Sequence, residues 1–277
     1  MTKVFRQSLA IALMALLSPA LAAQSYRVLL SNDDGIESPL LAALQLELAA
    51  MPGGEVVVAA PDVNQSGSSQ STAGGPIVVD KIYRDGSFFG YAVHGKPADA
   101  VRFGLVELGK DNAFDLVVSG INLGANVGDV SHLSGTVGAA MEGLYQGVPA
   151  IAISQDVEGV DTAASAKFAT QLVARYQQHG APVDVMISIN IPRGELKGVL
   201  VRPMGDSYLR TIAYDLVEQS DNQSVYERER IIAQSTDTST DTYAYQQGYI
   251  TLTPLKFDWT DYELIDELES WDLQLVE

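Results

Sequence analysis

Short apolar runs alternate with segments of helical spacing from Tyr26 onward, and this alternation constrains the fold more than any other feature of the chain. Near-continuous apolar strands separated by helices imply a parallel sheet that is covered on both faces. Ser38 before Pro39 predicts the start of the first helix. The expected strands are residues 26–31, 55–60, 115–119, 150–154 and 185–190, and the expected helices contain the apolar sets 40/44/48, 137/140/141/144 and 168/172/176.

Two parts of the chain depart from this alternation. Residues 77–82 and 87–93 flank Asp85-Gly86, which predicts an inserted β-hairpin. Beyond about residue 200 the pattern is less regular, with a strand-like run at 248–255. Residues 258–277 carry eight acidic residues and no basic one among their apolar residues, which predicts an amphipathic helix that packs on another surface. With 277 residues and 47% apolar content, we expect one α/β domain over 24–277, in which 200–277 form a C-terminal extension.

The first residues are typical of a secretory signal peptide. Lys3 and Arg6 precede the apolar run 9–17, and small residues at 18–23 provide a cleavage site. The run is shorter than the roughly 20 residues of a membrane-spanning helix, although a retained N-terminal anchor is the weaker alternative. We therefore expect residues 1–23 to be removed, and the mature protein to be periplasmic or secreted and free of the membrane.

Composition excludes several classes of function. The chain has no cysteine, which excludes disulfides, thiolate metal sites and a cysteine nucleophile. Its formal charge of −18 argues against nonspecific binding to nucleic acid or anionic lipid, because both need a basic surface. Three histidines without metal-ligand spacing make a histidine-ligated zinc site improbable.

Two adjacent carboxylates, Asp33 and Asp34, follow the first expected strand and precede Gly35. Such a pair suits a hard divalent cation, but it is equally typical of an Asx turn that leads into a helix. The loops at 61–69 and 120–126 also follow expected strands and are rich in glycine and small oxygen-bearing side chains. Since ligands bind beyond the carboxyl ends of parallel strands, we expect these three loops to converge on one site.

A further segment, 132–136, lies directly before the helix that is expected from Val137. Free backbone N–H groups and the helix dipole make such a start an anion site. A capping role for Ser134 or Thr136 is compatible with this function. His132 is either a general acid or, more simply, a histidine that faces solvent.

Five blocks of the chain, in order between about residues 26 and 255, resemble the SurE family of survival-protein nucleotidases. They are Ser31-Asn32-Asp33-Asp34-Gly35, residues 60–67, Ser119-Gly120-Ile121-Asn122, residues 134–143 and residues 248–255. The resemblance implies a Rossmann-like three-layer domain with a mostly parallel sheet, and a C-terminal extension that assembles a homodimer or homotetramer. It also implies one divalent cation per subunit, Mg²⁺ or Mn²⁺, with Asp33, Asp34, Ser66 and Asn122 as its ligands.

The function expected from this resemblance is metal-dependent hydrolysis of nucleoside 5′- and 3′-monophosphates. Asp33, Asp34 and Asn122 are then the catalytic residues, and either water or one of the aspartates attacks phosphorus. The residues expected to contact substrate or its phosphate are Asn32, Asn126, Ser134, Gly135, Thr136 and Lys96. A secreted protein that binds a nucleotide or phosphorylated ligand without turnover is the alternative.

Three positions depart from the family pattern. Family members commonly have a basic residue at position 65 and threonine at position 96, where this chain has Gln65 and Lys96. Leu133 replaces the family's tyrosine before Ser-Gly-Thr. Lys96 either attracts an anionic substrate that the overall charge repels, or is a solvated surface lysine.

Overall fold

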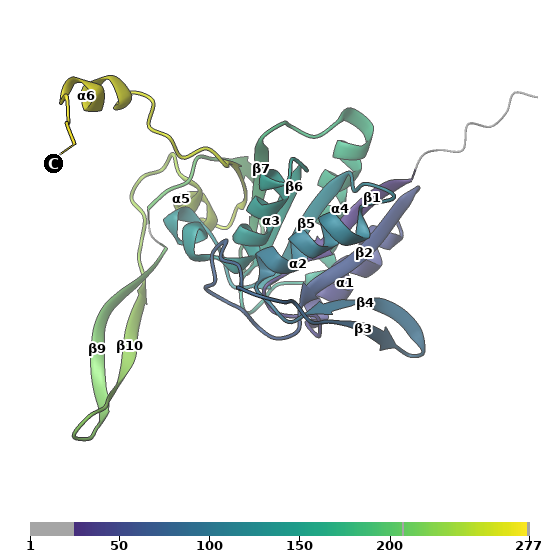
Figure 1. Cartoon of the computed structure of the whole chain (residues 1–277), viewed down its shortest axis with the longest axis horizontal. Helices are drawn as coiled ribbons and strands as arrows, with labels where there is room; N and C mark the ends of the chain where they lie inside the picture. The colour runs from purple at the N-terminus through teal and green to yellow at the C-terminus, as the bar shows by residue number, and fades with distance from the viewer. Residues whose placement is uncertain (1–24, 207, 276–277) are drawn as a thin grey trace, which may run out of the picture.

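The computed structural model describes residues 25–206 and 208–275, and its core is a mostly parallel sheet between two layers of helices (Figure 1). In the described residues the sheet has nine strands in the order β3-β4-β2-β1-β5-β6-β7-β11-β8. Strands β4, β2, β1, β5, β6 and β7 run parallel, whereas β3 and β11 are antiparallel to β4 and β7. The strands are β1 (Tyr26–Ser31), β2 (Gly54–Pro61), β3 (Val79–Arg84), β4 (Ser87–Val93), β5 (Leu116–Leu123), β6 (Ala150–Gln155), β7 (Val185–Ile191), β8 (Val199–Val201) and β11 (Ile250–Lys256).

Helices cover both faces of this sheet (Figure 1). On one face α1 (Pro39–Ala49) packs against α4 (Thr162–His179), and on the other α2 (Pro97–Phe103) packs against α3 (Gly135–Tyr145). Successive residues of a strand point to opposite faces. Accordingly, Val28 and Leu30 lie in the apolar cluster under α1 and α4, while Leu29 lies in the cluster under α2 and α3. The expected three-layer, Rossmann-like α/β fold is confirmed.

The predicted hairpin forms, but it belongs to the main sheet. Asp85 and Gly86 have φ angles of 48° and 78°, as a tight turn between β3 and β4 requires. Strand β4 then pairs in parallel with β2, so that Ala92 lies opposite Ala60. The hairpin therefore extends one edge of the sheet instead of forming a separate insertion.

Strand β5 is longer than the sequence predicts. Residues 120–123 have the glycine and asparagine content of a loop, yet they continue the strand as far as Leu123. The pairing of β5 with β6 shifts register between Ser119 and Asn122. This irregularity lets the chain pass through a loop-like sequence without leaving the sheet, and it places Asn122 on the strand.

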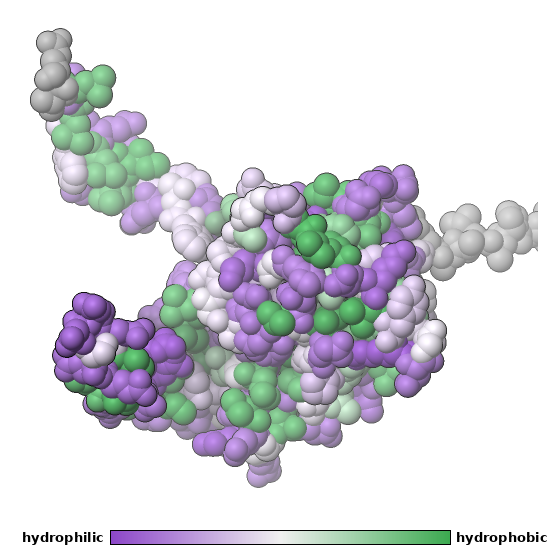
Figure 2. All heavy atoms as spheres, turned by 60° about the horizontal axis from the view of Figure 1, so that its bottom comes forward, coloured by the Kyte–Doolittle hydropathy of each residue, from purple (hydrophilic) through white to green (hydrophobic). Residues whose placement is uncertain are grey.

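Two segments beyond residue 200 extend away from the sheet (Figure 1). The first is the antiparallel hairpin of β9 (Leu209–Gln219) and β10 (Ser224–Ile232), which the sequence patterns did not predict. The second is the C-terminal arm, residues 257–275, whose residues are all exposed and in which apolar and acidic side chains alternate (Figure 2). Its helix α6 (Ile265–Ser270) has only six residues and buries none of them. Only the first residues of the arm contact the rest of the described chain, where Phe257 meets Tyr145 and Trp259 meets His132. The helix itself has no buried residue, so the expected packing of an amphipathic helix is not found within the described single chain.

Short helical segments complete the chain. They are the π-helix at Gly104–Leu108, the 3-10 helix at Gly128–Leu133 and α5 (Asp241–Gln246). Within the described residues, no helix combines the length and the apolar character needed to cross a membrane. The predicted signal peptide, residues 1–23, lies outside the described part of the chain.

Candidate functional site

The turn after β1 carries the two adjacent carboxylates and is closed by its own side chains. Asn32 donates from Nδ2 to the Gly35 carbonyl at 2.9 Å and accepts the Gly35 N–H at 3.2 Å. Gly35 has φ of 99°, and a Cβ at this position would lie 3.0 Å from the Val63 carbonyl carbon. The positive φ and the close approach both require glycine. This turn buries Asp33 and leaves Asp34 partly exposed.

The N-terminus of α3 lies directly against Asp33. Thr136 donates from its hydroxyl to Asp33 Oδ1. A Cβ on Gly135 would lie 2.9 Å from Asp33 Oδ2 and 2.7 Å from Ser68 Oγ. Ser134 is the N-cap, and its hydroxyl accepts the N–H of Val137 at 3.1 Å. The segment 134–136 thus combines a helix start with a close backbone approach, which is the arrangement that admits an anion.

The loops after β2 and β5 converge on the same carboxylates. Gln65 donates its N–H to the Asp33 carbonyl at 2.7 Å. Asp34 accepts a hydrogen bond from Asn64 Nδ2 at 3.2 Å and another from the N–H of Leu123 at 3.1 Å. The three strand ends that the sequence grouped together are therefore neighbours in space, as expected from the parallel sheet.

The carboxylate pair is electrostatically uncompensated. Burial, together with the charge of the adjacent Asp34, raises the pKa of Asp33 to about 6, against the lowering effect of the Thr136 hydrogen bond. Burial also raises the pKa of Asp34, while its hydrogen bond from Leu123 lowers it. In the described part of the chain neither carboxylate has an ion pair with lysine, arginine or histidine. Buried charge of this kind is costly unless a counterion compensates it.

The oxygen donors around the pair fit a hard divalent cation. Among the described residues no group of three or more His, Cys, Asp or Glu side chains surrounds a common point. A cation here would therefore depend on two carboxylates together with neutral oxygens and water, a combination typical of Mg²⁺. Asn122 is buried and donates from Nδ2 to the Gly124 carbonyl at 2.7 Å, and no hydrogen bond is found for its Oδ1 within the described chain. Its carbonyl oxygen is thus available as a ligand.

Ser66 and Ser68 lie differently with respect to this site. Ser66 is exposed, and its N–H donates to Asn64 Oδ1 at 3.0 Å. Asn64 in turn donates to Asp34, so Asn64 links Ser66 to the carboxylate pair. Ser68 has a buried Oγ without a hydrogen-bond partner in the structure, and it faces Gly135 beside Asp33. Sequence reasoning missed Ser68 and Asn64, because nothing in a serine- and asparagine-rich loop distinguishes one such residue from the next.

The remaining predicted residues have distinct surroundings. Asn32 uses both polar groups within its turn, so its contribution here is to the shape of the loop. Asn126 donates from Nδ2 to Ser154 Oγ at 2.8 Å and from its N–H to Asn190 Oδ1 at 2.7 Å, which ties the loop after β5 to β6 and β7. Lys96 donates from Nζ to Gln65 Oε1 at 2.8 Å, so its charge lies against the carboxylate loop.

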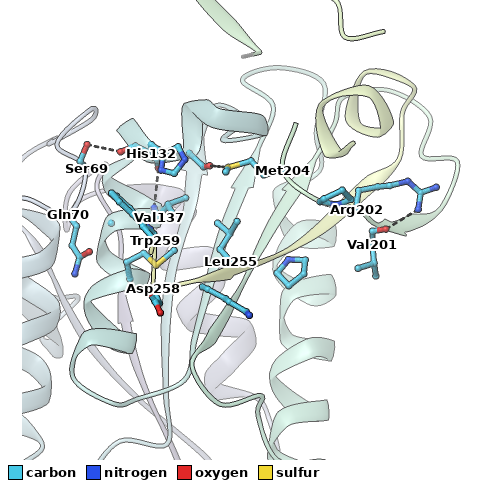
Figure 3. A pocket seen from close by; sticks show the side chains of 17 residues that line it. Ser69, Gln70, His132, Val137, Val201, Arg202, Met204, Leu255, Asp258 and Trp259 are labelled. Atoms are coloured by element: carbon cyan, nitrogen blue, oxygen red, sulfur yellow. Dashed lines mark hydrogen bonds between the residues drawn. The ribbon is translucent and has the colours of Figure 1, made fainter. Parts of the chain in front are cut away.

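His132 lines a cavity whose walls include neither Asp33 nor Asp34 (Figure 3). Its ring meets Trp259 edge to face, with ring centroids 5.3 Å apart. This cavity of about 600 Å³ begins beside Ser134, the N-cap of α3, and runs along the helix, past Val137 and Met141, to Leu255. Leu255 pairs with Met186 near the start of β7, at the edge of the sheet opposite to the loops around Asp33 and Asp34. The cavity contains neither aspartate, and the geometry gives no support to His132 as the general acid.

Comparisons with known proteins agree with this geometry. Residues 28–211 match the family model described as survival protein SurE. The chain belongs to the SurE family. The SurE relatives include one from Aeromonas hydrophila, 39% identical over 90% of this chain and 99% of its own, and one from Chlorobaculum tepidum, 36% identical over 91% and 96%. Both are named 5′-nucleotidase SurE.

A solved structure extends the agreement to the fold. The crystal structure of the SurE protein from Aquifex aeolicus superimposes with a TM-score of 0.77 at 33% identity, covering 89% of this chain and all of that one. The expected family is thus confirmed over nearly the whole described chain. The five sequence blocks that carried the resemblance include all three loops around Asp33 and Asp34.

Proposed function

We propose that this SurE family member is a metal-dependent phosphomonoester hydrolase that releases phosphate from nucleoside 5′- and 3′-monophosphates. The observation that carries the proposal is the uncompensated pair Asp33 and Asp34, held against the N-terminus of α3. Related chains that are 34–39% identical over most of this length are named 5′-nucleotidase SurE, which supports the same activity here.

The predicted metal ligands are Asp33, Asp34, Asn122 and Ser66, with Mg²⁺ or Mn²⁺ as the ion and one ion per subunit. When bound, such an ion neutralises charge on the phosphoryl oxygens and assists the departure of the leaving oxygen. Ser68 is a further candidate oxygen ligand, because its buried hydroxyl has no hydrogen-bond partner among the described residues. These assignments rest on the donor set and on the lack of a counter-cation.

The chain's own groups bind and orient the phosphate. The N–H groups of Gly135 and Thr136, at the start of α3, are placed to hold phosphoryl oxygens, since glycine leaves room for them. Thr136 holds Asp33 in one orientation through its hydroxyl. Lys96 brings a positive charge to the loop of Gln65 and so attracts the substrate. Either water or an aspartate carboxylate attacks phosphorus in line with the leaving oxygen.

An activity screen tests this function. The mature protein is incubated with nucleoside 5′- and 3′-monophosphates in the presence of Mg²⁺ or Mn²⁺, and released phosphate is measured with and without EDTA. We expect hydrolysis that EDTA abolishes and that added metal restores. Binding of nucleotide with no release of phosphate under any metal would instead support the alternative, a binding protein without turnover.

We further propose that the protein assembles as a homodimer or homotetramer. The hairpin β9–β10 exposes Ile212, Tyr214, Leu216 and Tyr226, and the C-terminal arm exposes Trp259 and Trp271. A lone two-stranded hairpin is marginally stable in water, and contiguous exposed apolar surface marks interaction sites. The apolar groove along α3 adds a further surface that a second copy would cover.

Export to the periplasm or exterior is proposed from the sequence pattern of residues 1–23. N-terminal sequencing of native material tests it, with a start near Ala23 or Gln24 expected. A soluble cytoplasmic protein that retains Met1 would contradict export.

A further inference from the structure

A polar pocket lies beside the carboxylate site, where the base of the β9–β10 hairpin meets the sheet. Its volume is about 320 Å³, within the range of sites for small ligands. Asp156 and Arg193 follow the carboxyl ends of β6 and β7, Tyr208 lies at the foot of the hairpin, and Tyr245 comes from α5. None of these residues was assigned a role by the sequence motifs.

This pocket lies on the same edge of the sheet as Asp33 and Asp34. The N–H of Leu123 bonds to Asp34 Oδ2 at 3.1 Å, and Leu123 pairs with Gln155, the residue before Asp156. Asp156 in turn donates its N–H to the Ile191 carbonyl at 2.9 Å. Because β6 is two strands from β1, Asp156 is about 10 Å from the carboxylate turn along the sheet edge. That spacing suits a ligand whose phosphate and far end occupy the two sites together.

The pocket groups favour a ligand that carries hydrogen-bond donors and a flat ring. Tyr245 donates its hydroxyl to Asp156 Oδ2 at 3.2 Å, and Arg193 Nε is 4.0 Å from the same oxygen. Burial, followed by the charge of Asp156, raises the pKa of the Tyr245 phenol, so it stays neutral and donates. The Asp156 carboxylate disfavours a second phosphate and accepts hydroxyl or amino donors.

Aromatic side chains provide the surface for the ring. Tyr208 and Tyr245 meet edge to face, with ring centroids 5.5 Å apart and an interplanar angle of 82°. Tyr245 is buried, whereas Tyr208 is only partly buried and retains accessible ring surface. Bases stack readily on such rings, and this stacking tolerates differences in base identity.

We propose that this pocket receives the nucleoside part of the substrate, with Tyr208 packing on the base and Asp156 accepting hydrogen bonds from base or sugar donors. The inference rests on the proposed nucleotidase function and adds to it the residues that distinguish a nucleotide from a simple phosphomonoester. The larger cavity along α3 also reaches this edge of the sheet, beside Ser134, but it runs from there to Leu255 at the opposite edge and shares no lining residue with the pocket of Asp156 and Tyr208.

The test compares kcat/KM for adenosine and guanosine monophosphates with kcat/KM for glycerol phosphate, which has no base. Tyr208→Ala should lower the ratio of the two values about tenfold, the loss expected from one stacked base. Asp156→Asn should lower the same ratio. Asp156 lies at the end of β6 in the main sheet, so this second variant tests the pocket even if Tyr208→Ala disturbs the hairpin. Tyr83→Ala, an exposed tyrosine on the distant strand β3, is the matched control and should preserve the ratio.

A second readout separates this inference from the proposed function. Binding of adenosine, which has no phosphate, is measured by NMR on the wild type and both pocket variants, and binding should weaken in the variants. If the wild type hydrolyses nucleotides but neither variant changes the ratio, the pocket assignment is overturned and the nucleotidase function stands. If the wild type hydrolyses no phosphomonoester, the proposed function fails, and adenosine binding alone then decides whether the pocket holds a nucleoside.

Discussion

Asp33 shows how a residue that we propose as a metal ligand is costly for folding. Its carboxylate is almost completely buried, accepts a hydrogen bond from Thr136 and lies beside a second carboxylate. No lysine, arginine or histidine of the described chain forms an ion pair with either carboxylate. Burial of an ionised carboxylate destabilises the fold. Such a residue is retained where a cation or substrate compensates its charge.

Asp33→Asn should reduce phosphatase activity by at least about a hundredfold, because a neutral amide holds a divalent cation poorly. The same variant should be more stable than the wild type in EDTA. The folded pKa of Asp33 is raised to about 6, so its ionised form is disfavoured by folding. Asp33 therefore costs the wild type roughly 2 kcal/mol of stability as the pH rises from about 4 to about 6, and the asparagine variant lacks this contribution.

The measurements are phosphate release with Mn²⁺ and urea unfolding in EDTA at pH 4, 6 and 8. Asp111→Asn, at an exposed aspartate before the start of β5 and so at the opposite edge of the sheet, is the matched control and should change neither quantity. Retention of wild-type turnover by Asp33→Asn at saturating metal would contradict the metal site as described.

Substitution of Lys96 tests whether one positive charge near the site offsets the negative electrostatic potential of the chain. Lys96→Thr should raise KM for nucleoside monophosphates several-fold with little change in kcat, the signature of lost uniform binding. Its Nζ is 2.8 Å from Gln65 Oε1, in the loop that also bonds to Asp33. Kinetics are measured at low ionic strength, where charge effects are least screened. Lys81→Thr, which makes the same change on strand β3, is the control, and equal KM values for both variants would remove Lys96 from the site.

At the scale of elements, the N-terminus of α3 forms part of the proposed site. Gly135→Ala should lower activity at least tenfold, because the added Cβ would lie within 3 Å of Asp33 and Ser68 atoms. Alanine is otherwise a better helix former than glycine, so the loss would come from the site. Gly74→Ala, where a Cβ meets nothing within 4 Å, is the control in the measurement of phosphate release. Full activity of Gly135→Ala would show that the carboxylates tolerate a displaced helix start.

Strand β3 is linked to the loop after β2 by one histidine. His94 Nε2 is 2.8 Å from Asp80 Oδ2, and His94 Nδ1 is 3.4 Å from Asp62 Oδ2. The hydrogen bond with Asp80, and then the charges of Asp62 and Asp80, raise the pKa of His94. A raised pKa means that this contribution to stability is complete below pH 6.5 and is lost as the pH rises through the folded pKa.

NMR titration of the His94 imidazole should therefore give a pKa above 6.5, and Asp80→Asn should lower it. Asp85→Asn, in the turn of the same hairpin, is the control and should leave the value unchanged. If Asp80→Asn left the pKa of His94 unchanged, the contact between His94 and Asp80 would not persist in solution.

At the scale of the whole molecule, the hairpin and the C-terminal arm leave apolar surface that the single chain does not cover (Figure 2). Ile212→Glu should shift the assembly to a lower mass, because it places a charge on exposed apolar surface of β9 in a chain of net charge −18. Light scattering after size-exclusion chromatography measures the mass. Thr211→Glu, which adds the same charge at the adjacent polar residue of β9, is the control. A monomeric wild type would contradict the proposed assembly.

The sequence by itself determined the α/β class, five strands of the parallel sheet within a few residues, and the convergence of three loops. These follow from local rules: apolar runs form buried strands, and the ends of parallel strands share one edge. It also singled out Asp33 and Asp34, because two adjacent carboxylates after an apolar strand can be recognised from the sequence alone.

Only the tertiary structure decided which contacts and pockets form between residues that are far apart in the chain. The β9–β10 hairpin escaped prediction because its strands pack on no core, so no periodic burial marks them. The pairing of Lys96 with Gln65, the orphan hydroxyl of Ser68 and the pocket that joins Asp156 to Tyr208 and Tyr245 each require distant residues to meet. Such meetings depend on how the layers pack, which local sequence patterns do not encode.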